Sequence, residues 1–198
     1  MQNPPLSRSV HRLVRAAAAL FFFVGTLSGC VAAPAPSNTA EPVAVATPAP
    51  PEAPPVFASN DEALAAATAA YAEYQQMSND IAHEGGADPQ RISHFTVGDV
   101  LQSELGAYGR MSKSGLHLVG DLAFDSFTLQ SADLSSGDVT AYVCLDVTQT
   151  DVVDATGASV IPSGRPDRYP LQVSLLHDSS SNRLFVEKSD SWSGSNFC

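Results

Sequence analysis

The spacing of hydrophobic positions changes near the middle of the chain, from a helical repeat to a strand-like alternation. Between residues 59 and 86 the apolar positions recur at helical spacing, at Leu64, Ala67, Tyr71, Tyr74 and Ile81. This repeat predicts a helix that follows a capping box at residues 59–62 and ends at Gly85-Gly86. A short helix is predicted from Asp88-Pro89, and a longer one from a second capping box at residues 96–99 to Gly115.

After Gly115 apolar and polar residues alternate, which predicts strands. The predicted strands are residues 116–119, 122–129, 139–150, 169–175 and 184–188. Residues 160–161 are predicted as a short strand or a sheet edge. A slip of one residue in the second strand indicates a bulge near Asp125-Ser126. In the third strand, Tyr142, Cys144 and Asp146 face away from the apolar residues. Helices followed by a meander of strands predict an α+β fold, with two or three N-terminal helices covering one face of an antiparallel sheet.

The N-terminal residues are typical of a secretory signal. Three arginines precede an apolar run over residues 16–27, which is shorter than the about 20 residues of a membrane-spanning helix. The run ends in Leu27-Ser28-Gly29-Cys30, which resembles the lipobox of bacterial lipoproteins. That resemblance implies cleavage after residue 29 and a thioether-linked diacylglyceryl group on Cys30. An uncleaved N-terminal anchor is the alternative, and the small residues before Cys30 count against it.

Residues 30–58 are rich in alanine and proline and contain few large apolar side chains. Such a composition predicts a disordered tether with polyproline II character, about 90 Å long at most. We therefore expect three parts: a lipoprotein signal peptide over residues 1–29, the lipidated Cys30 with its tether over 30–58, and one folded domain over 59–198. This organisation predicts a lipid-anchored protein at the outer face of the cytoplasmic membrane.

Net charge and sequence motifs argue against several kinds of partner and active site. The formal net charge is −11, and no basic cluster occurs, which argues against a nucleic-acid partner. The histidines lie on separate elements, and neither a Gly-rich phosphate loop nor a G-x-S-x-G elbow is present. The sequence therefore predicts no cofactor and no metal.

The chain has three cysteines. With Cys30 assigned to lipidation, Cys144 and Cys198 are an even pair in an oxidising compartment. A bond between them would contribute about 4 kcal/mol in the chain-entropy model, for a loop of about 50 residues. Two unpaired buried thiols are the alternative.

Three segments resemble a known group of proteins. They are AYVCLDV at residues 141–147, RPDR at 165–168 and WSGSNFC at 192–198. Together with the order of the elements, they resemble small secreted actinobacterial lipoproteins with an NTF2-like (cystatin-like) domain. The resemblance implies a curved antiparallel sheet that forms a cone with the helices. It implies no activity, because the superfamily includes isomerases, dehydratases, ligand binders and inert adaptors.

A candidate pocket follows from this resemblance, because ketosteroid-isomerase-like members place a carboxylate base and a Tyr or Asp donor inside the cone. The matching residues are Tyr71, Tyr74, Tyr142, Asp146, Arg168 and Trp192. A structural role is nevertheless the favoured interpretation. Asp146 is expected to pair with Arg165 or Arg168, the helix tyrosines to lie in the core, and Trp192 to pin the C-terminal tail.

We expect a lipid-anchored extracytoplasmic binding or interaction module, whose partner is an unidentified small molecule or protein. An isomerase- or dehydratase-type enzyme with a site inside the cone is the first alternative. A solute-binding receptor is the second, although one domain offers no cleft between two lobes. Pairing of two copies through the open sheet face is also left open.

Overall fold

The computed structural model describes residues 53–198, so the predicted signal peptide, the lipobox with Cys30 and most of the tether lie outside the described residues. The elements are α1 (Asn60–His83), the 3-10 helix η1 (Pro89–His94), α2 (Gly98–Ser114), β1 (His117–Val119), β2 (Ala123–Ala132), β3 (Val139–Asp146), β4 (Asp151–Val153), β5 (Arg168–Asp178) and β6 (Arg183–Ser191). Within residues 53–198, no helix has the length and apolar character that crossing a membrane requires.

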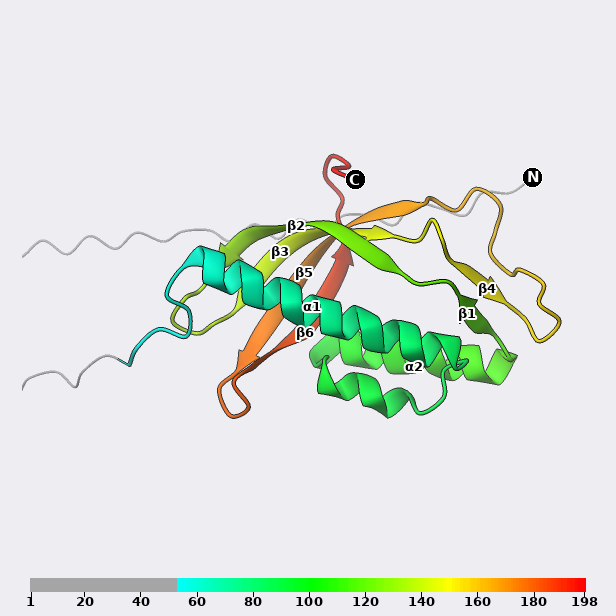
Figure 1. Cartoon of the computed structure of the whole chain (residues 1–198), viewed down its shortest axis with the longest axis horizontal. Coiled ribbons are helices and arrows are strands. Elements are labelled where there is room, and N and C mark those ends of the chain that lie inside the picture. The colour runs from blue at the N-terminus through cyan, green and yellow to red at the C-terminus, as the bar shows by residue number, and fades with distance from the viewer. Residues whose placement is uncertain (1–52) are drawn as a thin grey trace, which may run out of the picture. The chain divides into compact units, whose positions relative to one another are not determined.

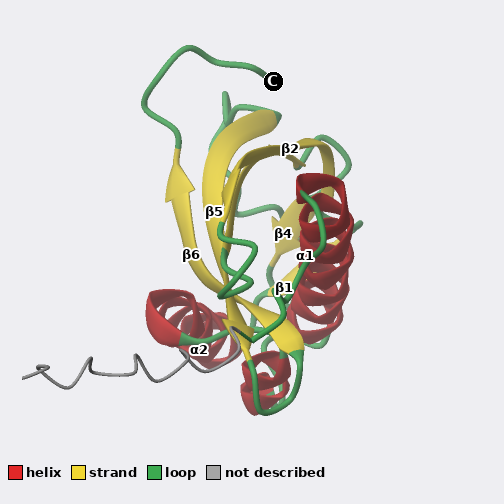
Figure 2. Cartoon of the chain, turned by 90° about the vertical axis from the view of Figure 1, so that its left-hand side faces the viewer, coloured by secondary structure: helices red, strands yellow, loops and turns green. Residues whose placement is uncertain are grey.

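The predicted α+β architecture is confirmed. A four-stranded antiparallel sheet has the order β2-β3-β5-β6, and β1 and β4 form a separate two-stranded sheet. Figure 1 shows α1 along the larger sheet, with β1 and β4 at the end of the domain away from the start of α1. Figure 2 shows the curvature of the strands and α1 on one side of them. Helices and curved sheet together make a cone-like domain.

The first helix begins and ends where the sequence predicts. The Ser59 hydroxyl accepts a hydrogen bond from the Glu62 N–H at 3.2 Å, and the Glu62 carboxylate accepts one from the Ala58 N–H at 2.7 Å. After the helix, Gly86 has a φ of 80°, and a Cβ there would lie 2.3 Å from the carbonyl oxygen of Tyr108. This position therefore needs glycine both for its conformation and for the close approach of α2.

The caps of the next two helices differ from the prediction. Asp88 has a φ of 44° and makes no side-chain cap, and the N-cap of α2 is Val97 instead of Thr96. The physical reason is burial: Thr96 is fully buried beside β6, and its hydroxyl donates to the carbonyl of Ile92 at 3.0 Å. The predicted capping box at residues 96–99 is therefore wrong, although a helix does start there.

The residues before α1 contact the connection between β2 and β3. The N–H groups of Val56 and Phe57 both donate to the carbonyl of Leu134, at 2.8 and 3.2 Å. Phe57 is buried in the core. Residues just before Ser59 therefore also pack against the domain.

The bulge predicted in β2 is confirmed, because its register against β3 shifts between Asp125 and Thr128 and Ser126 has a φ of 53°. The predicted strand 139–150 instead divides at Asp146, after which the chain turns and continues as β4. The guanidinium of Arg165 stabilises this turn by donating to the carbonyls of Val147 and Thr150, at 2.7 and 2.9 Å.

Residues 160–161 form no strand of their own and follow the edge of β4, which is one of the two forms predicted for them. The Val160 N–H donates to the Val152 carbonyl at 2.9 Å, and the neighbouring pairing of Ser159 with Val153 is a single bridge. This segment therefore only lines the edge of β4.

The core lies between α1 and the larger sheet. Small residues on α1, among them Ala63 and Ala67, are fully buried and let the helix approach Ala141 and Val143 of β3 closely. Tyr71 is 1% exposed and belongs to the same core. Its ring packs against two phenylalanines of β2, Phe124 at 4.9 Å and Phe127 at 5.5 Å between centroids. Aromatic side chains thus fill this part of the interior.

Candidate functional site

The residues of the predicted pocket lie in two groups on opposite faces of the larger sheet. Tyr71 and Tyr74 belong to α1 and are buried on the inner face, with the core. Tyr142, Asp146, Arg168 and Trp192 lie on the outer face, because side chains alternate along β3 and Val143 points to the core. These residues therefore do not line one cavity.

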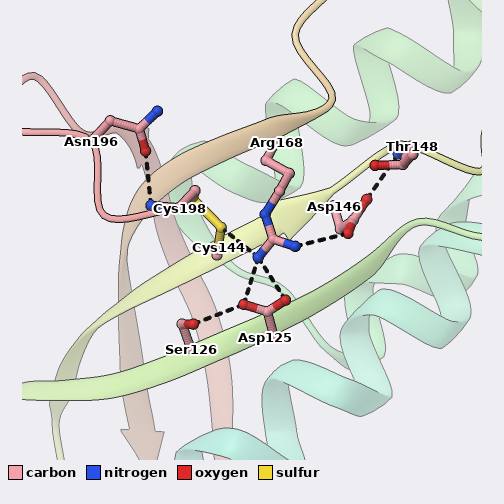
Figure 3. A network of polar contacts seen from close by, with 8 residues as sticks. All are labelled: Asp125, Ser126, Cys144, Asp146, Thr148, Arg168, Asn196 and Cys198. Carbon is pink, nitrogen blue, oxygen red and sulfur yellow. Dashed lines mark hydrogen bonds and ion pairs between the residues drawn. A yellow bond between two sulfur atoms is a disulfide. The ribbon is translucent and has the colours of Figure 1, made fainter.

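A charged network joins three neighbouring strands on the outer face (Figure 3). Arg168 on β5 donates to Asp146 on β3 at 3.0 Å and to both oxygens of Asp125 on β2, at 2.7 and 2.6 Å. The same guanidinium lies 3.1 Å from the sulfur of Cys144. The antiparallel register brings these groups together, because Asp146 is opposite Arg168 and Asp125 is opposite Cys144.

The network keeps its carboxylates ionised. Hydrogen bonds from the hydroxyl and N–H of Thr148, assisted by the charge of Arg168, hold the pKa of Asp146 below its ordinary value. Hydrogen bonds from Arg168 and then Ser126 lower the pKa of Asp125. Thr148 and Arg168 thus occupy the Asp146 carboxylate and favour its ionised form. The predicted ion pair between Asp146 and Arg168 is present.

The C-terminal tail is fixed to the same face. A disulfide joins Cys144 to Cys198, and the Cα atoms are 5.5 Å apart. The Trp192 N–H donates to the carbonyl of Pro170 at 2.8 Å. The ring of Tyr142 lies against Trp192 and Phe197, with centroids 4.9 and 5.7 Å away. Trp192 therefore holds the tail on the sheet, as the sequence predicts.

A polar groove between α1, α2 and β6 was not predicted. It encloses about 480 Å³ and is lined by Tyr74, Asp99, Val100, Ser103, Glu104, Lys188, Ser189 and Asp190. The hydroxyl of Tyr74 donates to a carboxylate oxygen of Glu104 at 2.6 Å. We call this feature the α2–β6 groove.

The electrostatics of the groove centre on Glu104. Burial, followed by the nearby Glu104 carboxylate, raises the pKa of Tyr71, Tyr74 and Tyr108 above that of a free phenol. These phenols stay protonated, so that of Tyr74 is a fixed donor to Glu104, while that of Tyr108 donates to Ser78 at 2.9 Å. The arrangement offers a ligand a half-buried carboxylate whose other lone pairs can accept hydrogen bonds.

Glu104 could have been found from the sequence by its spacing. Val100, Glu104 and Tyr108 are four residues apart and share one face of α2, and the first and last of them are buried. A carboxylate between two core positions must lie at the boundary of the core. In the part of the chain that the structure describes, no group of three His, Cys, Asp or Glu side chains is arranged to hold a metal ion.

No protein-family model matches this chain, and no curated protein matches it significantly. Among solved structures, the intermembrane space region of the chloroplast protein ARC6 is 12% identical, with a TM-score of 0.48 over 65% of this chain and 97% of that one. Aln2 from a Streptomyces species is 17% identical, with a TM-score of 0.42 over 67% and 90%. A protein from Catenulispora acidiphila is 13% identical, with a TM-score of 0.40 over 63% and 89%. At these values the similarities say nothing about what this chain binds.

Proposed function

We propose that this chain is an extracytoplasmic binding module with an NTF2-like domain, anchored to the outer face of the cytoplasmic membrane through a diacylglyceryl group on Cys30. The cysteines support this location. Of the three in the sequence, the disulfide takes Cys144 and Cys198. Disulfides are typical of extracytoplasmic compartments, and Cys30 at the end of the lipobox is left for acylation.

Binding is favoured over catalysis by the state of Asp146. The carboxylate that the resemblance marks as a base pairs with Arg168, and it lies on the face of the sheet opposite the core. A base inside the cone would need an unpaired carboxylate and an open interior. Tyr71, Phe124 and Phe127 occupy that space instead.

The α2–β6 groove is the surface that we assign to the ligand. Its lining carries three carboxylates, from Asp99, Glu104 and Asp190, against one ammonium from Lys188. This balance favours ligands that carry amines and hydroxyls over anions. The hydroxyl groups of the lining serines add donors and acceptors that orient such a ligand.

Mass spectrometry tests the anchor. The intact mass of membrane-extracted protein should lack residues 1–29 and carry added lipid. Cys30→Ala should leave full-length precursor without lipid, whereas Cys198→Ala should still be processed. Unmodified wild-type precursor in the cytosol would refute the location.

Thermal shift tests the groove, with spermidine as the amine-bearing probe and succinate as the anionic control at matched ionic strength. Spermidine should raise the melting temperature of the wild type, and Ser103→Trp should remove this effect by filling the groove. Gln102→Trp is the matched control, because Gln102 is exposed on the same helix and does not line the groove. An equal rise in melting temperature in both variants would exclude the groove as the spermidine site.

The enzyme alternative has one observation in its favour, the contact of the Tyr74 hydroxyl with Glu104. Once a substrate displaces the hydrogen bond between them, a carboxylate beside a neutral phenol is a base-and-donor pair suited to abstracting a proton next to a carbonyl. Deuterium uptake from D₂O into a bound ketone, lost in Glu104→Gln, would favour this alternative. Ligand binding without any such exchange would favour the binding module.

A further inference from the structure

We infer that the Cys144–Cys198 disulfide is a thiol–disulfide exchange site, at which a Cys-x-x-Cys protein dithiol releases the C-terminal tail from the outer sheet face. This inference depends on neither the anchor nor the groove. It concerns a bond that joins residues separated by 54 positions in the sequence.

The two cysteines differ in exposure. Cys144 lies on β3, a middle strand of the sheet, and is 0% exposed, whereas Cys198 is an exposed residue. A thiolate attacks a disulfide in line with the bond, so attack is favoured at the cysteine that solvent reaches. The exposed end of the bond is therefore the entry point, and Cys144 is the leaving group.

Arg168 is placed to assist that leaving group. Its Nη2 lies 3.1 Å from the Cys144 sulfur and can donate a hydrogen bond to the thiolate as the bond breaks. Asp125 and Asp146 hold the guanidinium in place and offset part of its charge. The assistance is thus a directed hydrogen bond rather than a general positive field.

The exchange balances as a two-electron reduction. A thiolate of the external dithiol bonds to the Cys198 sulfur, the Cys144–Cys198 bond breaks, and its electron pair leaves on Cys144. The second external thiolate then bonds to the first external sulfur and displaces Cys198 as a thiolate. The external pair is oxidised to a disulfide, Cys144 and Cys198 are reduced, and the two external thiol protons pass to solvent or to the new thiolates.

Opening the bond frees the tail without disturbing the core. The released segment is the part beyond Trp192, because the Trp192 N–H keeps its hydrogen bond to the Pro170 carbonyl. The bond from the Cys198 N–H to Asn196 at 2.8 Å is internal to this segment. Besides the disulfide, the ring contact of Phe197 with Tyr142 attaches it to the sheet. The residues that hold α1 on the sheet lie on the opposite face, so the fold persists while Tyr142 and the Cys144 thiol become accessible.

Tryptophan fluorescence and alkylation test the exchange, because Trp192 is the single tryptophan of the chain. Full-length protein in mild detergent is treated with reduced thioredoxin, with dithiothreitol or with glutathione, and then with an alkylating reagent for mass analysis. We expect reduced thioredoxin to yield doubly alkylated Cys144 and Cys198, with red-shifted emission and an unchanged circular dichroism spectrum. Reduction by small thiols alone, or only after denaturation, would overturn the inference.

Variants of Arg168 separate assistance from simple stability. Arg168→Gln should slow reduction about tenfold, the value of one charge-assisted hydrogen bond, and Arg168→Lys should recover part of the rate. Arg165→Gln is the matched control, because Arg165 binds the turn after β3 and does not contact Cys144. Equal rates for wild type and Arg168→Gln, with both folded, would rule out the assisted leaving group.

Discussion

The two faces of β3 are held in place by different kinds of interaction. On the inner face, Ala141 and Val143 are fully buried against α1, and close packing secures them. On the outer face, Tyr142 and Asp146 are half-buried and are held by ring contacts, an ion pair and the neighbouring disulfide. The inner face therefore carries the stability of the domain, while the outer face carries attachments that can be removed one at a time.

The largest effect is expected on the inner face. Tyr71→Ala should lower the free energy of unfolding by about 3–5 kcal/mol, because it leaves a cavity among buried aromatic rings. Urea unfolding followed by circular dichroism measures the change. Tyr142→Ala is the counterpart on the outer face and should lower the free energy of unfolding clearly less. Equal losses at the two positions would contradict the division between the faces.

Removal of the disulfide should have the next largest effect. Replacing Cys144 and Cys198 by serine should lower the free energy of unfolding by about 2–4 kcal/mol, because the unfolded chain regains the entropy of an open loop. The circular dichroism spectrum of the folded state should stay that of the wild type, and Cys30→Ser should leave stability unchanged. Loss of the folded spectrum would mean that the tail is part of the core.

A smaller loss is expected at the boundary between α1 and α2. Tyr74→Phe removes the hydrogen bond to Glu104 and should destabilise the domain by about 1–2 kcal/mol, as measured by urea unfolding. Tyr108→Phe, which removes the neutral bond to Ser78, should cost less. A larger loss of stability for Tyr108→Phe would show that the hydrogen bond between Tyr74 and Glu104 contributes little to folding.

The smallest effect concerns the charged network and appears only in acid. The pKa values of Asp125 and Asp146 lie below their ordinary value of 3.8 in the folded protein. Their contribution to stability is therefore complete above about pH 5 and is lost as the pH falls through the ordinary value and then the lowered values. Asp125→Asn should flatten the decline of the melting temperature below pH 4. An unchanged decline would mean that these carboxylates are not the groups responsible.

Local periodicity was sufficient for elements whose neighbours in space are also neighbours in sequence. The cap at Ser59, the bulge at Ser126 and the alternation around Val143 each depend on a few adjacent residues. The break after Asp146 could not be predicted in this way, because Arg165 closes the turn from a distant loop. Glu104 was missed for a related reason, since its contact with Tyr74 joins two helices.

The predicted pocket combined residues that the fold places on opposite faces of the sheet. Alternation correctly assigned Tyr142 and Asp146 to the face opposite Val143, and helical spacing correctly grouped Tyr71 with Tyr74. What the pattern did not supply was the face on which α1 packs, because that choice depends on the whole sheet. The helix covers the apolar face, so the two groups are separated by the thickness of the sheet.

The entry of the chain into the domain has a mechanical consequence for an anchored protein. The N–H groups of Val56 and Phe57 share the carbonyl of Leu134, in the connection between β2 and β3. If Cys30 is anchored as proposed, a pull on the N-terminal side of the domain would reach this hairpin and the buried Phe57 ring before it reaches the first turn of α1. Tension would thus enter through the β2–β3 connection, and α1 would be shielded until those two hydrogen bonds break.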